Sequence, residues 1–293
     1  MTGFAGNAYN FDMPSANAHY HSRTPLSPDA LEVTVLGAGT STGVPVIGCD
    51  CSVCRSSDPF NKRLRPSILV RSLRRDGTST NILVDTSPDL RTQALRASID
   101  RVDAVLITHA HADHIFGMDD LRQFNFVNRS RIPVYGTPDV LNHLRTVFAY
   151  CFTQTQEGGG KPQLDLIEIT PGESFEIGGV SIRPLSVWHG TVPVTAYKFG
   201  ARFAYVTDVS AIPEETMGNL SDLDTLILDA VRPDPHPTHF GLQQAMDIVT
   251  AVRAERAYFN HLSHHFDYET TMRNLPAGME LAYDGLTFLI PGE

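Results

Sequence analysis

The chain has little of several features that would place it in a special class of protein. Its 293 residues include one tryptophan and four cysteines, and 23 basic residues face 33 acidic ones, for a net charge of −10. No apolar run approaches the roughly 20 residues that span a bilayer, so we expect no membrane association. Residues 1–30 have no basic start followed by an apolar core, so we expect no secretory signal. The acidic charge disfavours nucleic acid as a partner.

Three of the four cysteines lie close together, in the sequence Gly48-Cys-Asp-Cys-Ser-Val-Cys54. Cys49, Cys51 and Cys54 are too close to form a disulfide framework, and thiolates at this spacing are typical of a metal site. A tetrahedral structural zinc site needs a fourth ligand, which the spacing does not identify. Clustered thiols also favour a reducing compartment, so we expect a cytoplasmic protein.

The rest of the chain predicts a layered α/β (α+β) fold. Residues 1–30, rich in Asn, Ala, Ser and Pro, are predicted to form a poorly ordered arm. Apolar runs predict strands near 31–36, 67–70, 81–85, 103–108, 132–136, 164–169, 174–177, 180–187, 194–199, 203–207, 223–228 and 257–260. Helical periodicity or composition predicts helices at 88–98, 117–126, 138–150 and 241–254. The segment 153–163, with Gly158, Gly159 and Gly160, is predicted to be a mobile loop. Strands in two blocks suit two sheets face to face with helices outside, in one domain of residues 31–293.

A dense group of metal-ligand side chains follows one of these strands. The sequence Thr108-His-Ala-His-Ala-Asp-His114 comes directly after the apolar run 104–107. Imidazole and carboxylate groups bind first-row metals, and this spacing allows one short loop to serve two adjacent ions. Three more residues of ligand type, His189, Asp208 and His261, each follow a predicted strand in the same way. The recurrence predicts that these loops build one metal site.

In this order the motifs resemble those of the metallo-β-lactamase superfamily, over residues 31–293. The resemblance implies a four-layer αββα sandwich with a two-metal site at one edge of the sheets. It implies the following ligands: His109, His111 and His189 for one ion, Asp113, His114 and His261 for the other, and Asp208 bridging both. Asp113 is expected to be catalytic as well as a ligand.

A narrower resemblance comes from the cysteine cluster together with His261-Leu-Ser-His264. These motifs are similar to the phosphodiesterase branch that includes the phosphoribosyl cyclic phosphate phosphodiesterase of the carbon–phosphorus lyase pathway. The branch implies a structural zinc held by the three cysteines and His264, with His265 as the neighbouring alternative. It also implies a general acid 22 residues before His261, which is His239, with His236 as the competing candidate.

The resemblance therefore predicts a dinuclear metal-dependent phosphodiesterase, with cyclic phosphates among its candidate substrates. Two active-site ions, zinc or manganese with iron or nickel as alternatives, would activate water, and His239 would protonate the leaving group. The expected partner is a small phosphodiester, with a homodimer as a further expectation. Two alternatives remain open at this point: a tRNA 3′-processing endonuclease, and a non-catalytic metal-binding relative similar to the PQQ biosynthesis protein.

Overall fold

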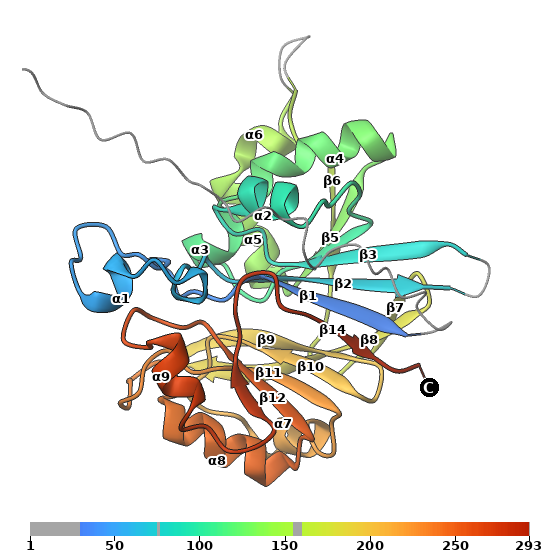
Figure 1. Cartoon of the computed structure of the whole chain (residues 1–293). Coiled ribbons are helices and arrows are strands. Elements are labelled where there is room, and N and C mark those ends of the chain that lie inside the picture. The colour runs from blue at the N-terminus through green and yellow to red at the C-terminus, as the bar shows by residue number, and fades with distance from the viewer. Residues whose placement is uncertain (1–29, 75–76, 155–159, 293) are drawn as a thin grey trace, which may run out of the picture.

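The computed structural model describes residues 30–74, 77–154 and 160–292 (Figure 1). Most of the predicted N-terminal arm, residues 1–29, and Gly158 and Gly159 of the predicted mobile loop lie outside the described residues. In the described part of the chain, two sheets of seven strands pack face to face, and helices cover both outer faces. This αββα arrangement confirms the predicted fold.

The two sheets share one pattern of strand pairing. Along each described sheet, the first three pairs of neighbours are antiparallel and the last three are parallel. The first sheet has the order β14 (Thr287–Ile290), β1 (Leu31–Gly37), β2 (Ser67–Leu73), β3 (Ser79–Val84), β4 (Ala104–Leu106), β5 (Ile132–Gly136) and β6 (Leu164–Glu168). The second has the order β13 (Met279–Leu281), β12 (Arg256–Asn260), β11 (Thr225–Asp229), β10 (Phe203–Val206), β9 (Val192–Phe199), β8 (Val180–His189) and β7 (Phe175–Ile177).

Helices lie on both outer faces and at one end of the sandwich (Figure 1). The first sheet is covered by α2 (Leu90–Arg96), α4 (Leu121–Asn128), α5 (Pro138–Val147) and α6 (Ala149–Phe152). The second is covered by α7 (Glu214–Asn219), α8 (Leu242–Val252) and α9 (Tyr268–Met272). The short helices α1 (Ser52–Arg55) and α3 (Ala112–Ile115) lie near one end of the sheets. None of the helices in the described ranges is long and apolar enough to cross a membrane.

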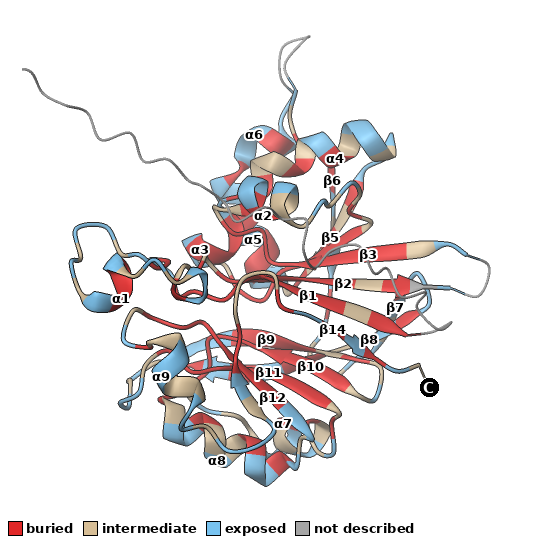
Figure 2. Ribbon diagram, in the orientation of Figure 1, coloured by how far each residue is buried: buried red, intermediate tan, exposed pale blue. Residues whose placement is uncertain are grey.

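Three apolar layers hold this arrangement together, one between each pair of neighbouring layers. Val33, Ile82 and Ile227 belong to the layer between the two sheets, while Leu83 and Leu228 face the helices on either side. Because side chains alternate along a strand, each central strand contributes to two layers. Burying one such side chain fully stabilises the fold by about 1.5–3 kcal/mol. Figure 2 shows the result, with buried strands at the centre and exposed residues on the outer sides of the helices.

Several predicted element bounds were wrong, for local reasons. The segment that carries the first ligands was predicted as a loop, but residues 112–115 form the helical turn α3. The predicted helix 138–150 is interrupted at Phe148, whose backbone leaves the helical region, and continues as α6. The helix predicted at 117–126 begins as a 3-10 turn, η2 (Met118–Asp120), and runs on to Asn128 as α4. Elements of three to six residues, such as α7 and β13, were missed because they are too short to show periodicity.

The pairing pattern places the ends of the parallel strands at one edge of the sandwich. Strands β3 and β4 are parallel in the first sheet, and β10, β11 and β12 are parallel in the second. The carboxyl ends of parallel strands meet at a common edge, so the loops that follow them lie together. These loops carry nearly all the residues considered next.

Candidate metal centre and active site

The seven predicted active-site ligands come together in groups around Asp208, which follows β10. Its Oδ2 lies 3.2 Å from His114 Nε2, and its Oδ1 lies 3.2 Å from His261 Nε2 and 3.9 Å from His109 Nε2. Asp113 Oδ2 lies 3.3 Å from His114 Nε2 and 3.5 Å from His261 Nε2. Three groups have all their ligand atoms within 4.8 Å of one another: Asp113, His114, Asp208 and His261; His109, His111 and Asp208; and His189, Asp208 and His239.

The ligand atoms are suited to a cation. The Nε2 atoms of His109, His114 and His261 are buried and have no hydrogen-bond partner within the described residues. A buried polar atom left unpaired costs about 1–3 kcal/mol, so three in one place need an explanation. Divalent ions bound between these nitrogens and the carboxylates of Asp113 and Asp208 would satisfy them, and the mixed nitrogen and oxygen donors fit zinc, manganese or iron. The residues present therefore fit a dinuclear metal centre.

Hydrogen bonds behind the site orient the imidazoles for this role. His114 Nδ1 donates to Asp85 Oδ2 at 2.7 Å, and His189 Nδ1 donates to the carbonyl of Thr238 at 2.6 Å. With the proton on Nδ1, the Nε2 lone pair of each ring is free to bind a metal. Asp85 Oδ1 and Oδ2 also accept from the backbone N–H and the hydroxyl of Thr108, both at 2.8 Å, which fixes the loop that carries His109.

Asp85 was not among the predicted site residues. It is fully buried and directly follows β3, so it repeats the pattern of an apolar strand ending in a carboxylate. That pattern was the available signal in the sequence. Asp85, Asp208 and His261 also share an uncommon backbone, with φ of 62°, 51° and 60°. Left-handed backbone at residues other than glycine is strained, and it clusters at functional sites.

The charges of the site perturb its titrating groups. Burial lowers the pKa of His261, but Asp208, Asp113 and Asp229 outweigh this and raise the pKa to about 9. Burial also lowers the pKa of His114, and Asp208 and Asp85 again outweigh it, raising the pKa well above the usual value. Burial tends to raise the pKa of Asp208, yet His261 and His114 hold it well below the ordinary range. Without metal, the cluster is therefore a set of carboxylates neutralised by imidazolium groups.

This balance predicts how the metal-free protein responds to pH. His261 has a raised folded-state pKa, so its stabilising contribution is complete below its unfolded value of 6.5 and is lost as pH rises through about 9. We expect the metal-free protein to lose stability, on the order of 3 kcal/mol, between these pH values. Thermal unfolding after chelation measures this. Metal binding displaces the same protons, so calorimetry in buffers of different ionisation enthalpy should detect proton release from His114 and His261. A metal-free melting temperature that rises over this pH range would contradict the prediction.

His239 also lies against the ligand cluster. Its ring centroid is 4.4 Å from that of His189 and 4.9 Å from that of His261, and only 8% of the residue is exposed. His239 Nδ1 donates to Asp229 Oδ2 at 2.7 Å, so Nε2 is the nitrogen left to act on a substrate. His236, the competing candidate, lies 5.2 Å from His239 between ring centroids, and its Nδ1 is occupied by the backbone and hydroxyl of Thr238. Asp229 was missed by the sequence analysis, although it too ends an apolar strand, β11.

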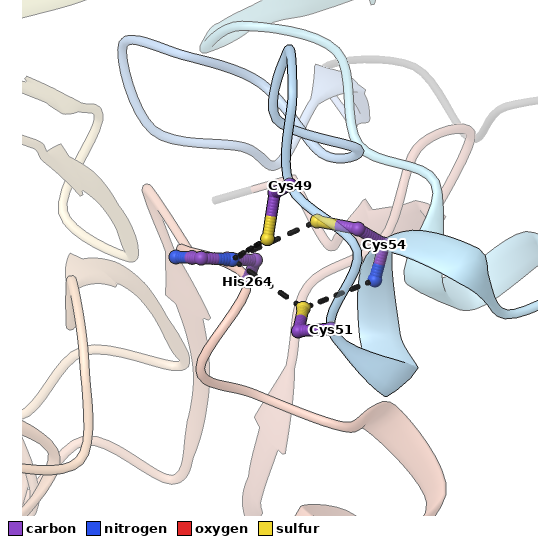
Figure 3. A group of neighbouring side chains, drawn as sticks. All are labelled: Cys49, Cys51, Cys54 and His264. Atoms are coloured by element: carbon purple, nitrogen blue, oxygen red, sulfur yellow. Dashed lines mark hydrogen bonds between the residues drawn. The ribbon is translucent and has the colours of Figure 1, made fainter.

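The cysteine cluster forms a second, separate centre (Figure 3). His264 Nδ1 lies 3.2 Å from Cys49 Sγ, 3.5 Å from Cys51 Sγ and 3.6 Å from Cys54 Sγ. A tetrahedral zinc with bonds of about 2.3 Å to sulfur and about 2.0–2.1 Å to nitrogen separates such atoms by about 3.5 Å. The four residues therefore fit a zinc ion. The neighbouring candidate, His265, is not in the cluster, and its Nδ1 lies 3.0 Å from Ser263 Oγ.

Local structure supports this second centre. The backbone N–H of Cys54 donates to Cys51 Sγ at 3.4 Å, and this hydrogen bond is the main cause that lowers the pKa of the Cys51 thiol to about 6. Arg63, with 2% of its surface exposed, donates to the carbonyls of Ser263 and Phe266 at 3.0 and 2.9 Å. The segment that follows the cysteines is thereby fastened to the loop that carries His264.

Substituting the histidine of this centre should separate its role from that of its neighbour. We expect His264→Ala to remove one metal ion per chain and to lower the melting temperature, because a site occupied at 1,000 times its Kd stabilises the fold by about 4 kcal/mol. His265→Ala is the matched control and should retain both the metal and the melting temperature. Metal analysis and thermal unfolding measure the two effects. Loss of metal from His265→Ala alone would reverse the assignment.

Two of the arginines considered as phosphate contacts are engaged in ion pairs. Arg65 makes a two-pronged pair with Asp89, with Nε–Oδ2 and Nη2–Oδ1 distances of 2.9 Å. Arg122 Nη1 lies 3.3 Å from Asp119 Oδ2. Neither guanidinium needs an anionic ligand to balance its charge.

Known proteins resemble the chain in both sequence and structure. The family model of the beta-lactamase superfamily domain matches residues 80–262. A crystal structure of a new diphosphatase from the PhnP family is 43% identical and covers 89% of this chain and 97% of its own, with a TM-score of 0.81. The zinc-bound PqqB of Methylobacterium extorquens, at 20% identity and a TM-score of 0.69 over 88% of this chain and 99% of its own, shares the fold.

Among curated proteins, an octanoyltransferase of Porphyromonas gingivalis is 38% identical over 258 residues. The alignment covers 87% of this chain but 51% of that protein, so the chain spans about half the length of this relative. Its name describes a protein with a large additional part. The domain match and the structure that is similar over nearly its whole length assign the chain more directly. The chain belongs to the β-lactamase superfamily and, within it, to the PhnP family, as a hydrolase with the metallo-β-lactamase fold.

Proposed function

We propose that the protein is a dinuclear metal-dependent phosphodiesterase that acts on small phosphodiesters, including cyclic phosphates. The observation that supports this most strongly is the position of His239 beside two complete groups of metal ligands. A two-metal centre alone would serve hydrolysis of many kinds of bond. A histidine held by Asp229 with Nε2 directed away from that carboxylate adds a proton donor, which an alkoxide leaving group requires.

We assign the ligands in two sets. His109, His111 and His189 would hold one ion, Asp113, His114 and His261 would hold the other, and Asp208 lies close enough to both sets to bridge them. When bound, such ions lower the pKa of a shared water and neutralise charge on the phosphate oxygens. The third ion, a structural zinc, would be held by Cys49, Cys51, Cys54 and His264.

The protein residues divide the remaining work among them. Asp208 and Asp113 supply negative charge that keeps the cations in place, while Asp85 and the carbonyl of Thr238 hold the His114 and His189 rings in the required tautomer. His239, as imidazolium, would give its Nε2 proton to the departing oxygen as the bond to phosphorus breaks. The buried setting of the ligands excludes bulk water and strengthens each of these interactions.

The PhnP-family neighbour is named a diphosphatase, which supports a related substrate class. A diester of diphosphoric acid and a phosphodiester present the same reacting group, a phosphorus with two ester-type oxygens. They differ in the leaving group, because a phosphate departs readily and an alkoxide needs a proton. We therefore place phosphodiesters with alkoxide leaving groups first, since they make use of His239.

The proposal is tested by assaying the purified protein after loading with Mn²⁺ or Zn²⁺. Substrates are bis-p-nitrophenyl phosphate, 2′,3′-cyclic nucleotides, a nucleoside diphosphate ester and a precursor tRNA. We expect hydrolysis of the small esters and about three metal ions per chain. Cleavage of the tRNA alone would favour a processing nuclease, and about one ion per chain with no hydrolysis would favour a metal-binding protein. No hydrolysis of any phosphodiester with all sites filled would refute the proposal.

A further inference from the structure

Asp229, the last residue of β11, lies behind the active site with both carboxylate oxygens turned toward functional groups. It is fully buried. Its Oδ2 accepts hydrogen bonds from His239 Nδ1 at 2.7 Å and from the backbone N–H of Val209 at 3.0 Å. Val209 directly follows Asp208, so this one oxygen fixes the His239 ring and the turn that carries Asp208.

The other oxygen of Asp229 faces a metal-ligand ring. Asp229 Oδ1 lies 3.9 Å from His261 Nδ1, and both atoms are buried without a hydrogen-bond partner in the part of the chain that the structure describes. A separation of 3.9 Å is too long for a direct hydrogen bond, but a small ring rotation or a bridging water closes it. When His261 Nε2 binds a metal, its ring proton must reside on Nδ1 and requires an acceptor. Asp229 Oδ1 is a carboxylate oxygen placed to accept it.

We infer that Asp229 is a positioning residue shared by the two halves of the reaction. Through Oδ2 it orients His239 for proton donation, and through Oδ1 it fixes the tautomer of His261 for metal binding. The inference rests on the proposed function, because it takes His239 as the proton donor and His261 as a metal ligand. One buried carboxylate then links the loading of the metal site to the readiness of the proton donor.

Asparagine at this position would disturb both links because it has one acceptor atom in place of two. If its oxygen faces His239 and Val209, its NH2 group meets the Nδ1–H of His261, and two donors oppose each other. If the amide is reversed, the NH2 group meets the donors of His239 and Val209. Either orientation leaves a buried donor unpaired, so Asp229→Asn cannot preserve both interactions.

A matched control is available in Asp85. It is also fully buried and accepts from an imidazole Nδ1 at the same distance, 2.7 Å, but its partner His114 is a proposed metal ligand and not a proton donor. Asp85→Asn should therefore weaken metal binding only. His239→Ala should impair proton donation and leave metal affinity unchanged. Asp229→Asn alone should show both defects.

The experiment compares the three variants with the wild-type holoenzyme by chelator competition and by the ratio of rates on an alkyl and a p-nitrophenyl phosphodiester. We expect Asp229→Asn to weaken metal binding about 10- to 100-fold and, once its metal sites are saturated, to lower the alkyl-to-aryl rate ratio at least about tenfold. Wild-type metal affinity or a wild-type rate ratio in this variant would overturn the inference.

Imidazole ¹⁵N spectra of the zinc-loaded wild-type protein provide a measurement that does not depend on any variant folding. We expect protonated Nδ1 in both His239 and His261, and an unprotonated Nδ1 in either ring would overturn the shared role. If the wild-type protein cleaves no phosphate ester, the proposed function fails. The tautomer and metal-affinity results then still decide whether Asp229 positions His261.

Discussion

Asp208→Ala is expected to remove both active-site metals and to lower phosphodiesterase activity by at least about 10³-fold. Asp208 Oδ1 and Oδ2 lie within 3.2–3.9 Å of three ligand nitrogens, on His109, His114 and His261. Without its charge, the cations lose the carboxylate nearest to both groups. Removing one partner of a buried charge pair costs about 3–5 kcal/mol, and about 4 kcal/mol corresponds to a factor of about 10³ in rate. Metal analysis and the phosphodiester assay measure the two effects.

The backbone of Asp208 calls for a second variant as control. Its φ of 51° is unfavourable for alanine but accessible to glycine, so Asp208→Gly removes the side chain without adding strain. Both variants should lose the active-site metals and retain the one at the cysteine cluster. Activity that survives in Asp208→Gly with about one metal per chain would contradict the role of Asp208. It would also show that the dinuclear centre is not required.

His239→Ala is expected to slow hydrolysis of an alkyl phosphodiester by about 10²–10⁴-fold, the usual contribution of a positioned general acid. The same substitution should slow bis-p-nitrophenyl phosphate by less than about tenfold, because p-nitrophenolate leaves without a proton. Comparing kcat/KM on the two substrates separates loss of the proton donor from general damage to the site. Equal losses on both substrates would mean that His239 acts in binding or folding.

His236→Ala is the control for this prediction. His236 lies three residues earlier on the same loop, with its ring centroid 5.2 Å from that of His239. Its Nδ1 contacts Thr238, and it has no carboxylate partner comparable to Asp229. We expect this variant to retain the wild-type ratio between the two substrates. A selective loss on the alkyl ester in His236→Ala would transfer the acid role to His236.

The sequence was sufficient to place most of the site, because the ligands follow strong local signals. His109 to His114 come directly after a buried strand, and Asp208 and His261 do the same. The resemblance to a known family supplied what spacing could not, namely that His264 completes the cysteine cluster. The structure brings His264 Nδ1 within 3.2–3.6 Å of the three sulfurs.

Asp85 and Asp229 could not be assigned in the same way. Their roles depend on which imidazole lies opposite each carboxylate, and the contacts join residues 29 and 10 positions apart through the turn geometry of separate loops. Nothing in a one-dimensional pattern specifies such a pairing. Short elements such as α3 and β13 escaped prediction for a related reason: tertiary contacts, rather than local propensity, hold them in place.

The distribution of ligands along the chain also imposes an order on how the protein can be made. The active site draws His109 to His114 from the first sheet and His189, Asp208 and His261 from the second. The cysteine cluster joins residues 49–54 to His264 in the same manner. Neither centre has its full ligand set until the ribosome has passed His264, so the thiols at 49–54 wait for more than 200 residues of further synthesis. Metal can therefore be captured completely only near the end of translation, when both sheets have docked.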